Sequence, residues 1–194
     1  MSILKEIKTS VIVTLVLLII CCGIYPLVVF GAGQLLFPKQ ANGSLVLGAD
    51  GKPIASTLLG QAFNDAKYFN PRPSAAGNGY DSTSSGGSNY GATSQALHDA
   101  VQQRVSDYRK ANYLPDSQLV PADAVEASGS GLDPHISIKN ALLQLPRVAK
   151  ARNMSEDDLK KLIDQYTDGR GFGILGEPGV NIVKLNLALD GKYK

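Results

Sequence analysis

The feature that most constrains this chain is a long, uncharged and strongly apolar stretch near its N-terminus. No Asp, Glu, Lys or Arg occurs between Lys8 and Lys39. A helix needs about 20 apolar residues to cross the hydrocarbon core of a bilayer, so this stretch predicts one transmembrane helix over residues 10–37. A cleavable signal peptide would have an apolar core of only about 7–15 residues, followed by a small-residue cleavage site. The sequence therefore favours an uncleaved anchor.

Positive charge marks the first end of the predicted span, where Lys5 and Lys8 lie. By the positive-inside rule, this end belongs on the cytoplasmic side of the membrane. We therefore expect a short cytoplasmic N-terminus over residues 1–9 and a single extracytoplasmic globular domain over residues 38–194. Lys39, just after the span, weakens the asymmetry but does not reverse it.

About 155 residues follow the span, which is enough for one domain with a hydrophobic core. The formal net charge is +2 and the basic residues are scattered. Nucleic-acid binding, which needs basic residues gathered on one face, is therefore not expected. The two cysteines, Cys21 and Cys22, both lie in the apolar stretch. The domain is expected to use neither disulfides nor thiolate metal sites.

Hydrophobic periodicity predicts three helices in the domain. They cover residues 93–113, residues 137–152 with Ser137 as the cap, and a stretch that begins at the Ser155 capping box. Pro146 lies inside the second of them and is expected to kink or shorten it.

Alternation and turn signals predict strands as well. Residues 44–47 and 53–59 flank the turn signal Asp50-Gly51 and are expected to pair as a hairpin. Near the end of the chain, apolar residues alternate with Lys184, Asn186 and Ala188, which predicts a half-buried strand over residues 183–189. The fold class that follows is an α/β (mixed α+β) soluble domain with a small sheet, anchored by one N-terminal transmembrane helix.

The motifs of common enzyme classes are missing. Gly51-Lys52 is followed by proline, so it is not a phosphate-binding loop. Ser130 lacks glycines at the positions that a nucleophile elbow requires. The two histidines, His98 and His135, lack carboxylates at useful spacing, and we expect a solvated side chain for the first and a structural hydrogen bond for the second. We therefore predict neither catalytic nor metal-binding residues.

Two loops rich in glycine and serine are the remaining candidate sites. The first, over residues 70–93, contains Tyr80, Asp81, Ser85 and Asn89; the second, over residues 127–135, contains Ser128, Gly129, Ser130 and Gly131. Backbone N–H groups of such loops can bind an anion, whereas carbonyls and hydroxyls can coordinate a cation. The alternative is that both loops are tight turns buried against the core.

Five longer motifs follow the apolar stretch in a fixed order. They are FPKQANGSL at residues 37–45, YFNPRPS at 68–74, SGGSN at 85–89, ASGSGLDPHIS at 127–137, and an ending over 175–190 that begins with LGEP. Together with the single span they resemble the C subunit of the Kdp-type potassium-transporting P-type ATPase over nearly the whole chain. Gly179 departs from the family's pattern, in which a bulky basic residue is expected, and any role that rests on a charge there is in doubt.

The resemblance implies a non-catalytic accessory subunit of an ATP-driven, high-affinity potassium uptake complex in the bacterial plasma (inner) membrane. Its expected partners are a potassium-conducting subunit, an ATP-hydrolysing subunit and membrane lipid, but no nucleic acid. The chain lacks the Asp-Lys-Thr-Gly phosphorylation motif, in agreement with hydrolysis on another subunit. In this interpretation it stabilises assembly and supports transport from the external side, and its cation-guiding or partner-facing loop carries Tyr80, Asp81, Ser85 and Asn89.

The family is also described as a catalytic chaperone that raises the ATP affinity of the hydrolysing subunit through a ternary complex with nucleotide. Ser128, Gly129, Ser130 and Gly131 would then contact ATP. The predicted orientation places them outside the cell, away from the partner's ATP, so the external role is favoured. No firmly bound cofactor is expected, and ATP or potassium would bind transiently at most. A third alternative, a membrane-tethered hydrolase, requires a nucleophile–base pair that the sequence does not display.

Overall fold

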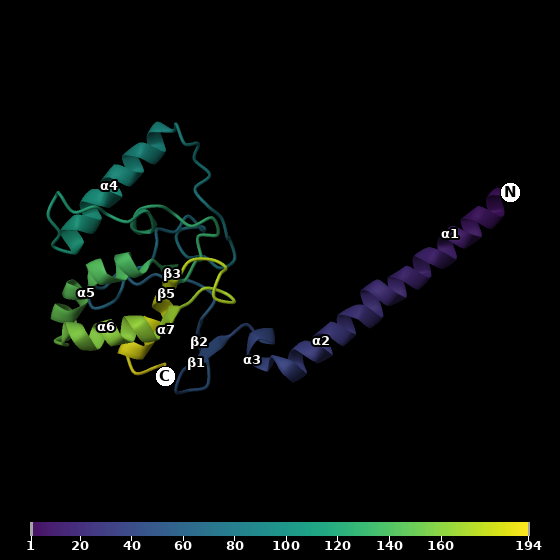
Figure 1. The fold of residues 1–194 in the computed structure, drawn as a ribbon. Coiled ribbons are helices and arrows are strands. Elements are labelled where there is room, and N and C mark those ends of the chain that lie inside the picture. The colour runs from purple at the N-terminus through teal and green to yellow at the C-terminus, as the bar shows by residue number, and fades with distance from the viewer. Residues whose placement is uncertain (1, 194) are drawn as a thin grey trace. The chain divides into compact units, whose positions relative to one another are not determined.

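The computed structural model describes residues 2–193, and the chain divides into two compact units, Met1–Leu45 and Val46–Lys194 (Figure 1). The first unit is a continuous helix of 34 residues, Ile3–Leu36, followed by the short helix α3 (Pro38–Ala41). The most apolar window of the long helix has a mean hydropathy of 2.8 and is not buried. By length and composition this helix can cross a membrane.

The long helix changes geometry before Pro26. It runs as α1 (Ile3–Leu18), a π-helical segment η1 (Ile19–Ile24) and α2 (Tyr25–Leu36). Proline has no N–H group, and its ring crowds the carbonyl four residues earlier. Widening of the preceding turn to π geometry accommodates that clash without ending the helix.

The second unit has its main core between three helices and a small sheet. The helices are α5 (Ile138–Arg152), α6 (Glu156–Gln165) and α7 (Ile182–Leu189). The antiparallel sheet has the order β3 (His135–Ile136), β5 (Gly179–Asn181), β4 (Thr167–Asp168). The residues fully buried between them include Phe69, Val148, Leu159, Ile163, Val180 and Leu185.

A two-stranded hairpin covers a second, smaller apolar cluster. Strands β1 (Leu45–Leu47) and β2 (Pro53–Ser56) turn at Gly51, whose φ of +73° suits glycine. Val46 and Ala55 pack against Val183 and Leu187 of α7. The predicted hairpin is confirmed, although its second strand ends three residues earlier than expected.

The predicted helices are confirmed with small shifts at their ends. The first is α4 (Gln95–Ala111), and the caps of α5 and α6 form as expected, because Ser137 accepts from the Asn140 N–H and Ser155 from the Asp158 N–H. Pro146 does not shorten α5. Buried residues on both sides of the proline, Leu145 and Val148 among them, hold the helix in place.

The strand predicted over residues 183–189 is wrong: this segment is α7. The Asn181 side chain accepts a hydrogen bond from the Lys184 N–H at 3.1 Å and caps the helix. Ile182, Val183, Leu185, Asn186 and Leu187 are all buried. A helix buried on most sides carries apolar residues at nearly every position, so a two-residue alternation carries no information about its conformation.

Candidate functional site

The two glycine- and serine-rich loops lie against each other. The Ser130 carbonyl accepts hydrogen bonds from the Gly86 N–H and the Ser85 hydroxyl, both at 2.9 Å. The Gly131 carbonyl accepts a hydrogen bond from the Ser74 hydroxyl at 2.7 Å. We call Ser74, Ser85, Gly86, Ser130 and Gly131 the loop junction. Candidates that the sequence placed in separate loops therefore belong to one structural element.

Close packing at the junction explains its glycines. Gly131 has a φ of +67°, and a Cβ atom there would lie 2.7 Å from the Ala76 nitrogen and 2.7 Å from the Gly86 carbonyl oxygen. Neither distance is tolerated, so the position requires glycine. Ser128 is also buried, whereas Gly129 and Ser130 are exposed. Of the four candidate residues in this loop, Ser128 and Gly131 are packed inside, and Gly129 and Ser130 lie at the surface.

The other candidates of the first loop shape that loop locally. The Tyr80 hydroxyl donates to the Arg72 carbonyl, and burial raises the pKa of Tyr80. The Asp81 carboxylate accepts hydrogen bonds from the hydroxyl and N–H of Thr83, at 2.6 and 2.9 Å, which hold the pKa of Asp81 below its usual range. Asn89 is exposed. Ser85 is itself part of the junction, and the Tyr80 N–H donates a hydrogen bond to the Ser74 hydroxyl at 2.8 Å.

A shallow hollow of about 500 Å³ lies beside the junction. It is lined by Leu58, Leu59, Arg72, Ser85, Ser128, Gly129, Ser130, Leu132, Asp133 and Pro134. Arg72 and Asp133 form an ion pair at 3.1 Å, so the charges at the hollow compensate each other. The Nε atom of Arg72 is buried and, in the described part of the chain, has no hydrogen-bond partner.

The Arg72–Asp133 pair is the first link of a line of alternating charges. His135 contacts Asp133 through Nδ1 at 3.4 Å and Asp168 through Nε2 at 2.9 Å, and Lys184 contacts Asp168 at 3.1 Å. We call Arg72, Asp133, His135, Asp168 and Lys184 the charge chain. It ties two loops to β3, β4 and α7, and it confirms a structural hydrogen bond for His135.

The charge chain shifts the titration of its members. Hydrogen bonding to Asp133 raises the pKa of His135; burial opposes this rise, and Asp168 adds to it. Burial alone would raise the pKa values of Asp133 and Asp168. Hydrogen bonds from His135 to both, and from Lys184 to Asp168, outweigh burial and hold both pKa values below their usual range. All five members of the charge chain are therefore ionised at mildly acidic pH.

Gly179 leaves space for the His135–Asp168 contact. It lies on the central strand β5, opposite Asp168 on β4, with β3 on the other side. A Cβ atom at Gly179 would lie 3.2 Å from the His135 Cβ and 3.5 Å from its Cδ2. The side chain of His135 therefore crosses the central strand where that strand has no side chain. Gly179 therefore has a physical role in this fold, which is to make room for that contact.

A buried polar cluster around Arg147 was not recognised in the sequence. The Arg147 side chain, only 4% exposed, donates to oxygens of neutral groups, namely those of Ala66, Tyr68, Asn70, Asn112 and Gln144, at 2.6–3.0 Å. Burial lowers the pKa of Arg147. Asn140, Gln144 and Arg147 recur at helical spacing on α5, and this polar stripe on an otherwise apolar face is the signal that could have revealed the cluster.

The segment before Arg72 is clamped between α5 and α7. Asn186 accepts from the Phe69 N–H and donates to the Phe69 carbonyl, both at 2.9 Å. Asn70 accepts from Arg147 at 2.7 Å. The YFNPRPS motif is thereby fixed to the core, and it delivers Arg72 and Ser74 to the charge chain and the loop junction.

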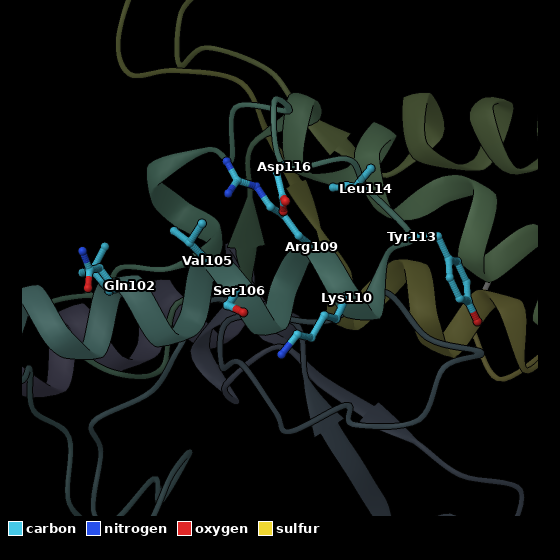
Figure 2. A pocket seen from close by; sticks show the side chains of 9 residues that line it. Gln102, Val105, Ser106, Arg109, Lys110, Tyr113, Leu114 and Asp116 are labelled. Atoms are coloured by element: carbon cyan, nitrogen blue, oxygen red, sulfur yellow. The ribbon is translucent and has the colours of Figure 1, made fainter.

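A second surface hollow, of about 470 Å³, lies along α4. Figure 2 shows Val105 and Arg109 on α4, with Leu114 and Asp116 from the segment that follows the helix. The Arg109 guanidinium donates to the Gln118 carbonyl at 2.9 Å and thus holds this segment against the helix. His98, on the same helix, is exposed as expected. The hollow therefore reflects how α4 meets its following loop.

Comparison with known proteins decides the family. The family model described as "K+-transporting ATPase, c chain" matches residues 7–191. This chain belongs to that family, the KdpC family. The potassium-transporting ATPase KdpC subunit of Mycobacterium tuberculosis strain H37Rv is 54% identical over 186 residues, which cover 96% of this chain and 98% of the relative.

Relatives from other bacteria agree. KdpC subunits of Geobacter metallireducens and Rhodopseudomonas palustris are each 48% identical, over 188 and 199 residues; each alignment covers 96% of this chain and 98% or 97% of the relative. The resemblance drawn from the five motifs is confirmed. A KdpC chain is a non-catalytic subunit of a potassium-transporting ATPase, so the accessory role expected from the sequence is confirmed at this level.

Proposed function

We propose that this chain stabilises a potassium-transporting ATPase complex and supports potassium uptake from the external side of the bacterial plasma membrane. The helix Ile3–Leu36 anchors it, and Lys5 and Lys8 favour a cytoplasmic N-terminus. The domain is then extracytoplasmic and covers the mouth of the potassium-conducting subunit. The ATP-hydrolysing subunit is the second protein partner, and lipid surrounds the anchor.

The observation that carries this proposal is the internal bonding of the loop junction. The Ser130 and Gly131 carbonyls accept hydrogen bonds from the neighbouring loop, the Gly131 N–H donates to the Ser128 carbonyl, and the Leu132 N–H donates to the Ser130 hydroxyl. A phosphate-binding loop instead offers a series of free N–H groups around an open cradle. The packing of the junction supports a structural joint over a nucleotide site.

The first loop is assigned to the partner-facing surface. Ser85 and Asn89 are exposed, whereas Asp81 and Tyr80 maintain the loop through Thr83 and Arg72. The exposed hydroxyl and amide oxygens suit transient contacts with a passing cation, and the compensated charges nearby do not repel it. We propose that this loop guides potassium without holding it.

One observation favours the catalytic chaperone as a second candidate. The buried Nε of Arg72 lacks a partner among the described residues, and its guanidinium lines the same hollow as the exposed Gly129 and Ser130. A phosphate oxygen in the hollow would supply the missing partner if the Arg72 side chain turned to expose this donor. This role requires the domain to share a compartment with ATP, so sidedness separates the two candidates.

The test is thiol labelling of intact cells. Ser130→Cys is introduced into full-length chain that lacks Cys21 and Cys22, and the cells, with any outer layer opened osmotically, receive a membrane-impermeant thiol reagent. We expect Cys at the exposed position 130 to react from outside. Ser2→Cys, at the other end of the anchor, is the matched control and should react only after the membrane is broken. The reverse pattern would overturn the proposed topology and make the nucleotide chaperone the leading function.

A further inference from the structure

The chain between β4 and β5 turns back on itself as a short hairpin (Figure 1). Three large apolar side chains of this hairpin are exposed. Phe172 is 97% exposed, Ile174 76% and Leu175 60%. We call these three residues the apolar tip. Single exposed apolar side chains are common on soluble proteins, but a cluster of large ones within four positions is typical of an interaction site.

The fold itself gains nothing from an aromatic residue at Phe172. Its side chain lies almost entirely in solvent, so it adds no core packing. Its backbone has a φ of +50°, in the left-handed region that a bulky L-residue occupies only at a cost. Glycine would serve the turn better, so the aromatic ring must act outside the chain's own structure.

The hairpin holds the tip in a defined geometry. Gly171 and Leu175 exchange two backbone hydrogen bonds, at 2.8 and 2.9 Å, and Arg170 donates to both carboxylate oxygens of Glu177 at the base. A side chain presented on such a bonded turn loses little conformational entropy when it is buried by a partner. This pre-organisation is typical of an anchor residue.

The charges near the hairpin distinguish a protein partner from a lipid surface. Arg170 is paired with Glu177, Lys184 with Asp168, and Arg72 with Asp133. Attraction to anionic lipid headgroups needs surplus basic residues, and here each of these cations is neutralised. An apolar centre with a polar, charge-compensated surround matches the anatomy of a protein–protein interface.

We infer that the apolar tip inserts into an apolar pocket of another subunit of the same complex. The identity of that subunit rests on the proposed function: with an extracytoplasmic domain, the pocket belongs to the potassium-conducting subunit. Phe172 is the central anchor, and Ile174 and Leu175 cover its edge.

The first experiment is site-specific photo-crosslinking in membranes that contain the whole complex. A photoreactive phenylalanine analogue replaces Phe172, and in a matched strain it replaces Leu119, which is 72% exposed outside the hairpin. We expect an adduct with the potassium-conducting subunit from position 172 and none from position 119. An adduct with lipid, an adduct with the ATP-hydrolysing subunit, or no adduct from position 172 would overturn the inference.

The second experiment measures docking by function. Full-length chain is titrated into purified complex that lacks it, and recovery of potassium-stimulated ATP hydrolysis is recorded. Phe172→Ala should raise the half-maximal concentration about ten-fold, the scale of losing one anchor residue. Leu119→Ala should change it less than two-fold. Equal behaviour of the two variants would overturn the inference.

A third variant excludes a folding defect. Phe172→Gly relieves the backbone strain, so its melting temperature should equal or exceed that of the parent chain while docking weakens as in Phe172→Ala. Loss of both together would contradict the assignment. Failure of this inference is separable from failure of the proposed topology, because thiol labelling at position 130 reports sidedness whether or not the hairpin crosslinks.

Discussion

Two polar networks in the same domain differ in how much water reaches them. The cluster around Arg147 is buried, and its guanidinium donates to the oxygens of neutral groups. The charge chain from Arg72 to Lys184 is partly exposed to solvent, and its members pair as full charges. A broken buried contact leaves a polar group without water, whereas a broken surface contact is replaced by solvent. The contribution of each network to stability therefore depends on its burial and not on its number of hydrogen bonds.

The largest effect should come from Arg147→Met. The substitution leaves several buried oxygens without a donor, so the free energy of unfolding should fall by about 3–5 kcal/mol. Arg170→Met, which breaks the exposed pair with Glu177, is the matched control and should cost less than about 1 kcal/mol. Denaturant unfolding of the full-length chain in detergent measures both. Similar losses would mean that burial does not separate the two networks.

A smaller loss is expected from Asn186→Leu, which keeps the side-chain volume but removes the clamp on Phe69. The buried N–H and carbonyl of Phe69 lose their partners, at a cost of about 2 kcal/mol. Gln103→Leu, at an exposed site on α4, should stay within about 0.5 kcal/mol of the parent chain. An equal loss in both variants would argue that the amide at position 186 does not clamp the core.

Asn186 also shows where sequence reasoning reached its limit. In an alternating pattern it was assigned to the solvent side of a strand, yet it is fully buried on a helix. Caps such as Ser137 and Ser155 were predictable because they act within three residues. The partners of Asn186 lie 117 positions away, and no local periodicity reports such a contact.

The candidate site was predictable in composition but not in arrangement. Both glycine- and serine-rich loops were recognised, because such runs rarely form regular structure. Their contact was not, since Ser85 and Ser130 are 45 positions apart. The apolar tip was missed for a different reason: exposure is a property of the folded surface, and Phe172 in sequence looks like any other core residue.

Gly179→Ala tests whether the His135–Asp168 contact depends on the missing side chain at Gly179. Gly179→Ala places a Cβ atom 3.2 Å from that of His135, so the histidine must shift away from Asp168. The pKa of His135 should fall towards its usual value, and stability should drop by less than about 1 kcal/mol. Gly169→Ala, where the new Cβ atom meets open space, should leave the pKa unchanged. NMR titration of the full-length protein in micelles measures the pKa of His135. Equal pKa values in the two variants would contradict the role assigned to Gly179.

The smallest effect is the pH dependence of the charge chain. The folded pKa of His135 is raised, so its contribution is complete below pH 6.5 and is lost as the pH rises through the folded value. The pKa values of Asp133 and Asp168 are lowered, so their contribution is present above pH 3.8 and is lost as the pH falls through the folded values. Stability should therefore peak between these limits, with an alkaline-side decline below about 1 kcal/mol. Unfolding at a series of pH values should show that His135→Gln lacks this decline; an unchanged slope would rule out His135 as its source.

The π-helical segment Ile19–Ile24 has a consequence for how the anchor meets its surroundings. A π-turn contains about one residue more than an α-turn, which rotates everything beyond it by roughly 100° relative to an uninterrupted α-helix. Side chains seven positions apart on either side of Ile19–Ile24 therefore point in different directions. A tryptophan scan along the anchor should accordingly yield two periodic patterns of tolerance that are out of phase, one along α1 and one along α2.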